Sequence, residues 1–83
     1  MDARLAKLKW RSRRGMRELD SVLLGFLDAH AAALGETEIA TFERILELPD
    51  PVLYDYLLGR RAPTDAAIAA LLERIRASAA THA

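Results

Sequence analysis

The stretch MRELDSVLLGFLDAHAAA, residues 16–33, decides the fold. Its apolar side chains recur every three or four residues, which is the spacing of an α-helix with one buried face. The residues that share this face are Met16, Leu19, Leu23, Phe26, Leu27 and His30. Gly35 then ends the predicted helix, because glycine easily adopts the backbone conformations that close a helix. An amphipathic helix of this kind needs other elements to cover its apolar face.

The same spacing of three and four residues continues on both sides of this stretch. We predict four further helices, over about residues 4–13, 36–48, 50–59 and 64–77. Their core-facing residues are Leu5, Leu8, Ile39, Phe42, Ile45, Leu46, Leu53, Tyr56, Leu57, Ile68, Leu71, Leu72 and Ile75. No strand-like alternation persists, so the expected fold is all-α, a small single-domain five-helix bundle.

Turn and cap residues set the expected ends of these helices. Gly15 is suited to the positive φ angle that ends the first helix. Asp50 is placed as an N-cap before Pro51 at the first helical position, and Thr64 can cap the last helix. A connector covers residues 60–63. We expect an ordered core over about residues 4–76 and a frayed tail from about residue 78.

The composition excludes several classes of protein. The 83 residues include no cysteine, so we expect neither disulfides nor thiolate zinc sites, and apolar packing must supply the stability. The longest apolar run, residues 66–72, is far shorter than the roughly 20 residues of a membrane-spanning helix. The basic start of the chain reads as part of the fold rather than as a presequence, and we expect a protein of the bacterial cytoplasm.

Groups for enzymatic chemistry are scarce in this chain. His30 lies on an apolar helix face, where we expect a packed residue at the edge of the core, and His82 lies close to the expected frayed end. No Ser-His-Asp set is evident. The four glycines are at least ten residues apart, so no phosphate-binding loop is present. We therefore expect no catalytic residue, no metal and no cofactor held by the chain itself.

Charge is sorted along the chain although the formal net charge is zero. Residues 1–17 hold seven basic residues and one acidic residue, whereas residues 18–83 hold five basic and eleven acidic residues. An asymmetry of this size indicates an interaction surface.

The sequence RRGMRELD, residues 13–20, places three arginines where one helix ends and the next begins. Arginines at a helix N-terminus oppose the helix dipole, so another interaction should offset them. Arg14 and Glu18 lie four residues apart and can pair on one face of the second helix. Trp10 and the bare backbone of Gly15 add contact surface for a partner. The pattern predicts a docking surface for a protein or a nucleic acid, because arginine pairs with carboxylates and phosphates in fixed geometry.

Two quoted segments carry a resemblance to a known family. The first is Trp10 followed by RRGMRELD, and the second is LELPDPVLYDYLLGRRAP, residues 46–63. Together they resemble the SdhE family, the small flavin-assembly factors of succinate dehydrogenase and fumarate reductase, over about residues 4–76. The family's RGxxE motif corresponds to Arg14, Gly15 and Glu18 with two residues between the glycine and the glutamate.

The resemblance implies a five-helix assembly factor that is not an enzyme. Family members promote covalent attachment of FAD to a histidine of the flavoprotein subunit of succinate dehydrogenase, and the catalytic atoms belong to that client. The flavoprotein subunit of fumarate reductase is a second candidate client, and the free chain is expected to be a monomer. The residues expected at the partner surface are Arg14, Gly15 and Glu18, their neighbours Arg13, Arg17 and Trp10, and Tyr56, where many members carry tryptophan.

Two other functions compete with this interpretation. A small helical nucleic-acid binder would use the basic first seventeen residues and would bind duplex DNA or RNA with a steep salt dependence. Overall neutrality, Glu18 within the patch and the acidic third and fourth helices weaken this alternative. A direct flavin-binding enzyme would give a yellow purified protein.

Overall fold

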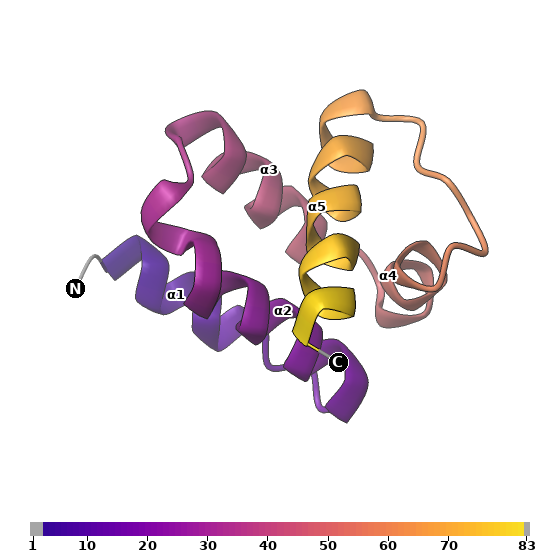
Figure 1. Ribbon diagram of the computed structural model, residues 1–83, viewed down its shortest axis with the longest axis horizontal. Coiled ribbons are helices and arrows are strands. Elements are labelled where there is room, and N and C mark those ends of the chain that lie inside the picture. The colour runs from indigo at the N-terminus through magenta and orange to yellow at the C-terminus, as the bar shows by residue number, and fades with distance from the viewer. Residues whose placement is uncertain (1–2, 83) are drawn as a thin grey trace.

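A computed structural model describes residues 3–82 of the chain as helices joined by short turns (Figure 1). In chain order the elements are α1 (Ala3–Arg11), α2 (Arg17–His30), the 3-10 turn η1 (Ala31–Ala33), α3 (Glu36–Leu46), α4 (Asp50–Leu57) and α5 (Ala66–His82). No strand is present between residues 3 and 82. The predicted all-α architecture with five helices is confirmed.

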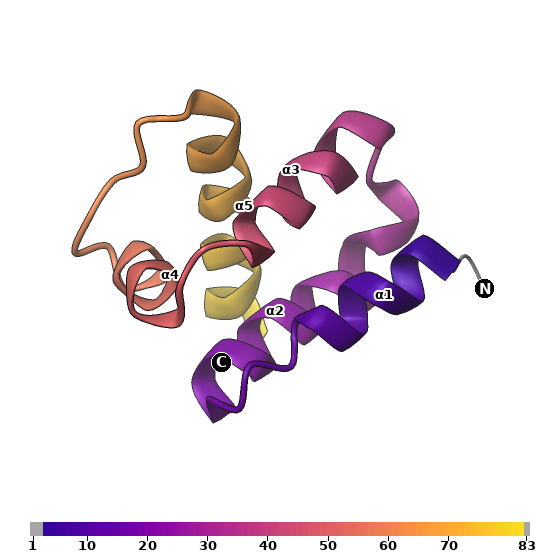
Figure 2. The same ribbon diagram turned by 180° about the vertical axis from the view of Figure 1, so that it is seen from behind.

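Helix α5 organises the packing, because it contacts α2, α3 and α4 (Figure 1). Helix α1 contacts α3, and the turn after α1 brings α2 back beside it. Figure 2 shows α1 and α2 side by side at one end of the molecule, with α4 on the far side of α5. The connection between α4 and α5 is the longest in the described chain and loops outward from the bundle.

The buried core takes residues from all five helices. The fully or almost fully buried apolar residues are Leu8, Leu19, Leu23, Phe26, Leu27, Leu34, Phe42, Ile45, Leu46, Leu53, Ile68, Leu71, Leu72 and Ile75. Phe26 and Phe42 are its largest fully buried side chains, with their rings stacked 6.1 Å apart between centroids. Other predicted core residues, such as Met16 and Ile39, are partly buried and pack against this cluster. The helical spacing of apolar residues therefore identified the core faces correctly.

Several predicted helix ends need correction. Helix α1 ends at Arg11 and α3 at Leu46, two residues earlier than predicted in each case, and α2 tightens into η1 after His30. Gly35 has φ −80° and is the N-cap of α3, where its amide donates to Glu38 Oε1 at 3.1 Å. Glu38 thus satisfies the amide of the residue before the helix, which favours a helix start at this glycine.

The caps of the last two helices also differ from the prediction. Pro49 occupies the cap position of α4, so Asp50 is its first helical residue. At α5 the capping side chain belongs to Asp65 and not to Thr64, because Asp65 Oδ1 accepts from the Ala67 and Ile68 amides at 2.9 and 3.0 Å. The helix continues to His82, past the expected frayed boundary at residue 78, and Ser78 is only 8% exposed.

Ion pairs join the N-terminal helix to the rest of the bundle. Arg4 Nη2 donates to Glu43 Oε1 at 2.8 Å, and Nε donates to the other carboxylate oxygen at 3.2 Å. The same guanidinium also pairs with Glu36. The hydrogen bonds from Arg4 hold the pKa of the Glu43 carboxyl below its ordinary value. The paired carboxylate therefore stabilises the fold while it is ionised.

We expect the replacement Glu43→Gln to make the melting temperature less sensitive to acid. A carboxyl whose pKa is lowered on folding stabilises the protein above its unfolded pKa and loses that effect as pH falls through the folded pKa. At pH 7 the variant should melt about 2–5 °C below the wild type. The difference should shrink as pH falls below about 4 and disappear once the pH lies below the lowered folded pKa of Glu43, where both side chains are neutral. Thermal melts followed by circular dichroism test this, and a gap that stays constant with pH would contradict it.

Candidate functional site

The turn between α1 and α2 is held by hydrogen bonds at both ends. Ser12 Oγ donates to the Leu8 carbonyl at 2.8 Å and closes α1. The Arg14 amide donates to Asp20 Oδ1 at 2.6 Å, so the first turn of α2 reaches back to the turn. Gly15 has φ +83°, as the sequence predicted, and an added Cβ would meet no atom within 4 Å. Glycine is therefore required here by the backbone angle and not by a lack of space.

Arg14 lies between this turn and the α3–α4 turn. Its side chain is only 15% exposed, and Nε donates to Asp50 Oδ1 at 2.7 Å. Nη1 donates to the Leu46 carbonyl at 2.6 Å, and Nη2 donates to the Leu48 carbonyl at 2.7 Å. The guanidinium thus satisfies a carbonyl left free at the end of α3 and pairs with the first residue of α4.

The expected pairing of Arg14 with Glu18 is therefore wrong. Arg14 pairs with Asp50 instead, because the chain is not yet helical at Arg14 and the spacing of four residues does not bring the side chains of Arg14 and Glu18 together. The hydrogen bonds of Arg14 are made within the fold, so its assignment to the partner surface stays a prediction. Glu18, by contrast, is exposed as expected.

The other predicted residues of this region lie on the surface. We call them the basic junction, and they are Trp10, Arg13, Gly15, Arg17 and Glu18. The Trp10 side chain is 74% exposed, which is unusual for so large an apolar group. Trp10 and Arg13 also border a hollow of about 410 Å³ that reaches inward to Arg14 and Asp50. The junction therefore combines two exposed arginines, one exposed carboxylate and an exposed aromatic ring.

The charges of the junction are offset locally. Arg17 is the first residue of α2, where its positive charge opposes the helix dipole. Glu18 and Asp20 lie in the same first turn and bring the opposite charge to it. The positive charge of Arg14 is offset by Asp50 instead. The unfavourable run of arginines is thus stabilised partly within the helix and partly by a residue 36 positions away.

A second hollow begins at Glu18 and extends between α2, α4 and α5. Its volume is about 170 Å³, and its lining is mainly apolar, with Val22 on α2 and Leu57 on α4 among the residues. Leu58, just after α4, also lines it and is 46% exposed. The sequence analysis did not identify this hollow. No sequence signal distinguished it, because adjacent apolar residues elsewhere in the chain, such as Leu71 and Leu72, are both buried in the core.

Tyr56 is not brought to the basic junction. It lies on α4, half-buried against the core, and the Arg61 guanidinium lies over its ring at 5.9 Å from the centroid. It lines neither of the two hollows described above. Its assignment to the partner surface therefore stays a prediction that the geometry of the junction does not support.

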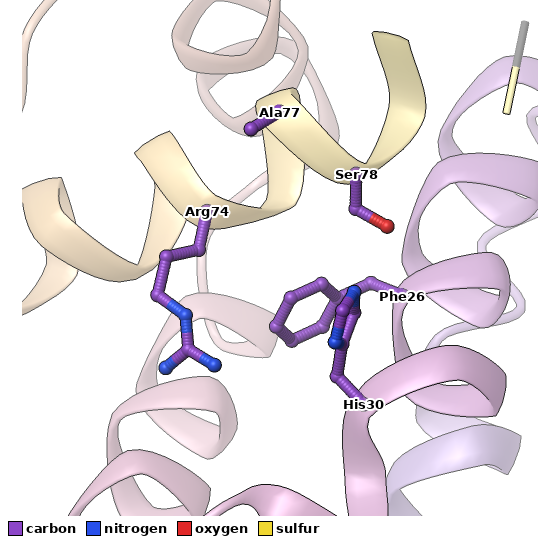
Figure 3. A pocket seen from close by; sticks show the side chains of 5 residues that line it. All are labelled: Phe26, His30, Arg74, Ala77 and Ser78. Atoms are coloured by element: carbon purple, nitrogen blue, oxygen red, sulfur yellow. The ribbon is translucent and has the colours of Figure 1, made fainter. Parts of the chain in front are cut away.

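A third hollow, of about 260 Å³, lies between the end of α2 and the last turns of α5 (Figure 3). The His30 ring packs on Phe26 with 5.0 Å between centroids, and the Arg74 guanidinium lies 5.9 Å from the Phe26 centroid. Figure 3 shows both side chains directed toward the Phe26 ring, with Ser78 above them. This confirms the prediction that His30 is a packed residue at the edge of the core.

The described residues lack two other kinds of feature. Within residues 3–82, no three acidic, histidine or cysteine side chains are grouped closely enough to bind a metal ion. Over the same residues, no helix combines the length and the apolar character that crossing a membrane requires. The basic junction is consequently the candidate site, because it combines residues of the sequence motif with an exposed surface.

Comparisons with known proteins point to one family. A family model described as flavinator of succinate dehydrogenase matches residues 6–79. The FAD assembly factor SdhE of Haemophilus ducreyi is 42% identical over 72 residues, which cover 87% of this chain and 88% of the relative. The FAD assembly factor SdhE of Xylella fastidiosa is 45% identical over 75 residues, which cover 90% of this chain and 77% of the relative. The FAD assembly factor SdhE of Coxiella burnetii is 37% identical over 70 residues, which cover 84% of this chain and 85% of the relative.

Proposed function

We propose a function on the basis of family: this chain belongs to the flavinators of succinate dehydrogenase. It acts as an assembly factor that binds the flavoprotein subunit of succinate dehydrogenase and promotes covalent attachment of FAD to it. The flavoprotein subunit of fumarate reductase is a second client. The chain works as a monomer in the bacterial cytoplasm, a location supported by its similarity to bacterial relatives.

The basic junction is the surface that meets the client. The observation that carries this assignment is the 74% exposure of Trp10 beside the exposed Arg13 and Arg17. Aromatic and arginine side chains dominate the binding energy of many protein interfaces. The arginines suit carboxylates of the client, and Glu18 suits a cationic group there. Gly15 has no side chain, so the client backbone can approach the turn closely.

The chain contributes position and not reacting groups. Its bound surface holds the client in a conformation in which the acceptor histidine and the C8-methyl region of FAD are aligned. Alignment of two reacting groups lowers the barrier substantially without any added catalytic residue. The flavin belongs to the client on this proposal, so the purified chain itself should be colourless.

The nucleic-acid alternative receives no support from the comparisons or from the charge arrangement. Three of the seven basic residues in positions 1–17 form ion pairs within the fold. Arg4 pairs with Glu43, Lys9 with Asp28 and Arg14 with Asp50. The basic segment of the sequence is thus partly neutralised in the folded protein, which weakens the field available to attract phosphates.

Reconstitution of the reaction tests the proposal. The purified chain is mixed with the apo flavoprotein subunit of succinate dehydrogenase and FAD, and the denatured subunit is examined for in-gel flavin fluorescence. We expect covalent flavin to accumulate much faster with the chain than without it, and not at all on a subunit whose acceptor histidine is replaced. Equal rates with and without the chain would contradict the proposed function.

A further inference from the structure

Arg14 joins three parts of the chain that are distant in sequence. Its backbone amide is bound by Asp20 in α2, and its guanidinium binds the carbonyls of Leu46 and Leu48 and the carboxylate of Asp50. These four hydrogen bonds are 2.6–2.7 Å long. The α1–α2 turn is thereby attached to the α3–α4 turn through a single side chain.

The geometry requires arginine and not merely a positive charge. Three short guanidinium contacts diverge to two carbonyl oxygens and one carboxylate oxygen, one from each nitrogen, and Nη1 makes a further contact of 3.5 Å to the Arg11 carbonyl. The planar guanidinium presents donors in fixed directions, whereas a lysine ammonium is a point charge on a flexible stem. Lysine can pair with Asp50 but cannot reproduce the whole set. The Leu46 carbonyl would then lose its partner at the end of α3.

The residues that flank Arg14 point outward while Arg14 points inward. Arg13 and Arg17 are exposed, and so are Gly15 and Glu18. The turn holds them in one arrangement, with Gly15 in a backbone conformation that an unattached chain would leave readily. The inward contacts of Arg14 therefore determine how the outward residues are presented.

We propose that Arg14 is a positioning residue of the docking surface and not a contact to the client. It fixes the basic junction on the α3–α4 turn so that Arg13, Arg17 and Glu18 meet the client flavoprotein in one preformed arrangement. The inference rests on the proposed function for its partner, and on the structure alone for the attachment of the turn. On this proposal, the arginine of the motif acts within the fold, and the glutamate contacts the client.

The proposal predicts a specific kinetic pattern for Arg14→Gln. Without the guanidinium, the junction occupies the binding-competent arrangement for only a fraction of the time, and the apparent affinity falls by that fraction. We expect the concentration of the chain that gives half-maximal flavinylation to rise at least about tenfold, because loss of even one of the guanidinium hydrogen bonds shifts an equilibrium by about that factor. The rate at saturating concentration should stay unchanged, because the assembled complex is the same. The half-maximal concentration for Arg14→Lys should lie between the values for the wild type and for Arg14→Gln.

The assay is run at a temperature at which circular dichroism shows every variant fully folded, so that global unfolding cannot produce the shift. Arg60→Gln is the matched control, because Arg60 is an exposed arginine after α4 with only a 3.8 Å pair to Asp55. It should leave both kinetic parameters as in the wild type. A lower saturating rate for Arg14→Gln with an unchanged half-maximal concentration would overturn the proposal.

A double-mutant cycle separates positioning from direct contact. Asp50→Ala should reproduce part of the Arg14→Gln shift, and the double variant should be no worse than Arg14→Gln alone, because both replacements break the same attachment. If Arg14 touched the client instead, the two shifts would multiply in the double variant.

A final measurement does not depend on the client. In the isolated chain, Arg14→Gln should shift the amide NMR resonances of Gly15 and Glu18 and speed the hydrogen exchange of the Asp20 amide, which donates to the Met16 carbonyl at 2.9 Å. Unmoved resonances would overturn the attachment even if flavinylation were lost. If the wild-type chain fails to promote flavinylation, the proposed function is wrong. The NMR and exchange measurements would still decide whether Arg14 holds the turn in place.

Discussion

Replacing Glu18 by glutamine should reduce flavinylation of the client to the rate seen without the assembly factor. Glu18 is an exposed residue of the basic junction at the start of α2, and it also lines the apolar hollow between α2, α4 and α5. The amide keeps the size of the side chain but removes its charge, so a cationic group of the client loses its partner. Loss of such a contact at an interface weakens binding by at least about thirtyfold.

The same replacement should leave the fold almost unchanged. Glu18 lies in the first turn of α2, where its charge interacts favourably with the helix dipole by about 0.3–1 kcal/mol. The melting temperature should therefore drop by only a few degrees, and the helical circular dichroism spectrum should persist. In-gel flavin fluorescence and a melt on the same sample measure both effects.

Asp28→Asn provides the matched control for this prediction. Asp28 lies in the same helix, ten residues and thus about 15 Å further along, and its 3.3 Å pair with Lys9 is on the surface. Loss of its charge should leave flavinylation at the wild-type rate. A Glu18→Gln variant as active as Asp28→Asn would show that the glutamate is not a client contact.

Phe42→Ala should unfold a large part of the population at 37 °C. Phe42 is fully buried and stacks on Phe26 in the core. Truncation of a buried phenylalanine costs about 3–5 kcal/mol because it removes apolar contacts and leaves a cavity. An 83-residue domain has a free energy of unfolding of only about 4–12 kcal/mol. A loss of this size consumes most of the stability of so small a core.

Urea unfolding followed by circular dichroism measures this loss. Phe42→Leu is the graded control, since leucine fills part of the same space and should cost about 1–1.5 kcal/mol. Helix α3 carries Phe42 and also the Leu46 carbonyl that Arg14 binds, so the larger truncation should disturb the α3–α4 turn as well. A cost below about 1 kcal/mol for Phe42→Ala would mean that the stacked rings do not dominate the core.

The helices and the core were predictable because their signals are local. The spacing of Leu19, Leu23, Phe26 and Leu27 repeats within one helix, and it identifies the buried face without knowledge of any partner. The positive φ of Gly15 was predictable for the same reason, since it follows from a helix end next to a glycine. Local geometry settles such features before the chain packs.

The roles of Arg14 and Asp50 were not predictable because their signal is tertiary. The two residues are 36 positions apart, and only the packing of α3 beside the first turn brings them to 2.7 Å. Sequence reasoning assigned Arg14 the nearest acid at helical spacing, and assigned Asp50 the role of a helix cap. Both assignments used the right kinds of interaction with the wrong partners. The sorted charges of the sequence had indicated an interaction surface and not this internal pair.

Trp10 gives the molecule an optical label of its own. It is the single tryptophan of the chain, and its ring stands in water beside the arginines. The emission of an indole depends strongly on whether water or apolar groups surround it, so covering of this face changes the fluorescence of one known residue. Association with a larger protein at the proposed docking surface can thus be followed by the fluorescence of Trp10, without any attached dye.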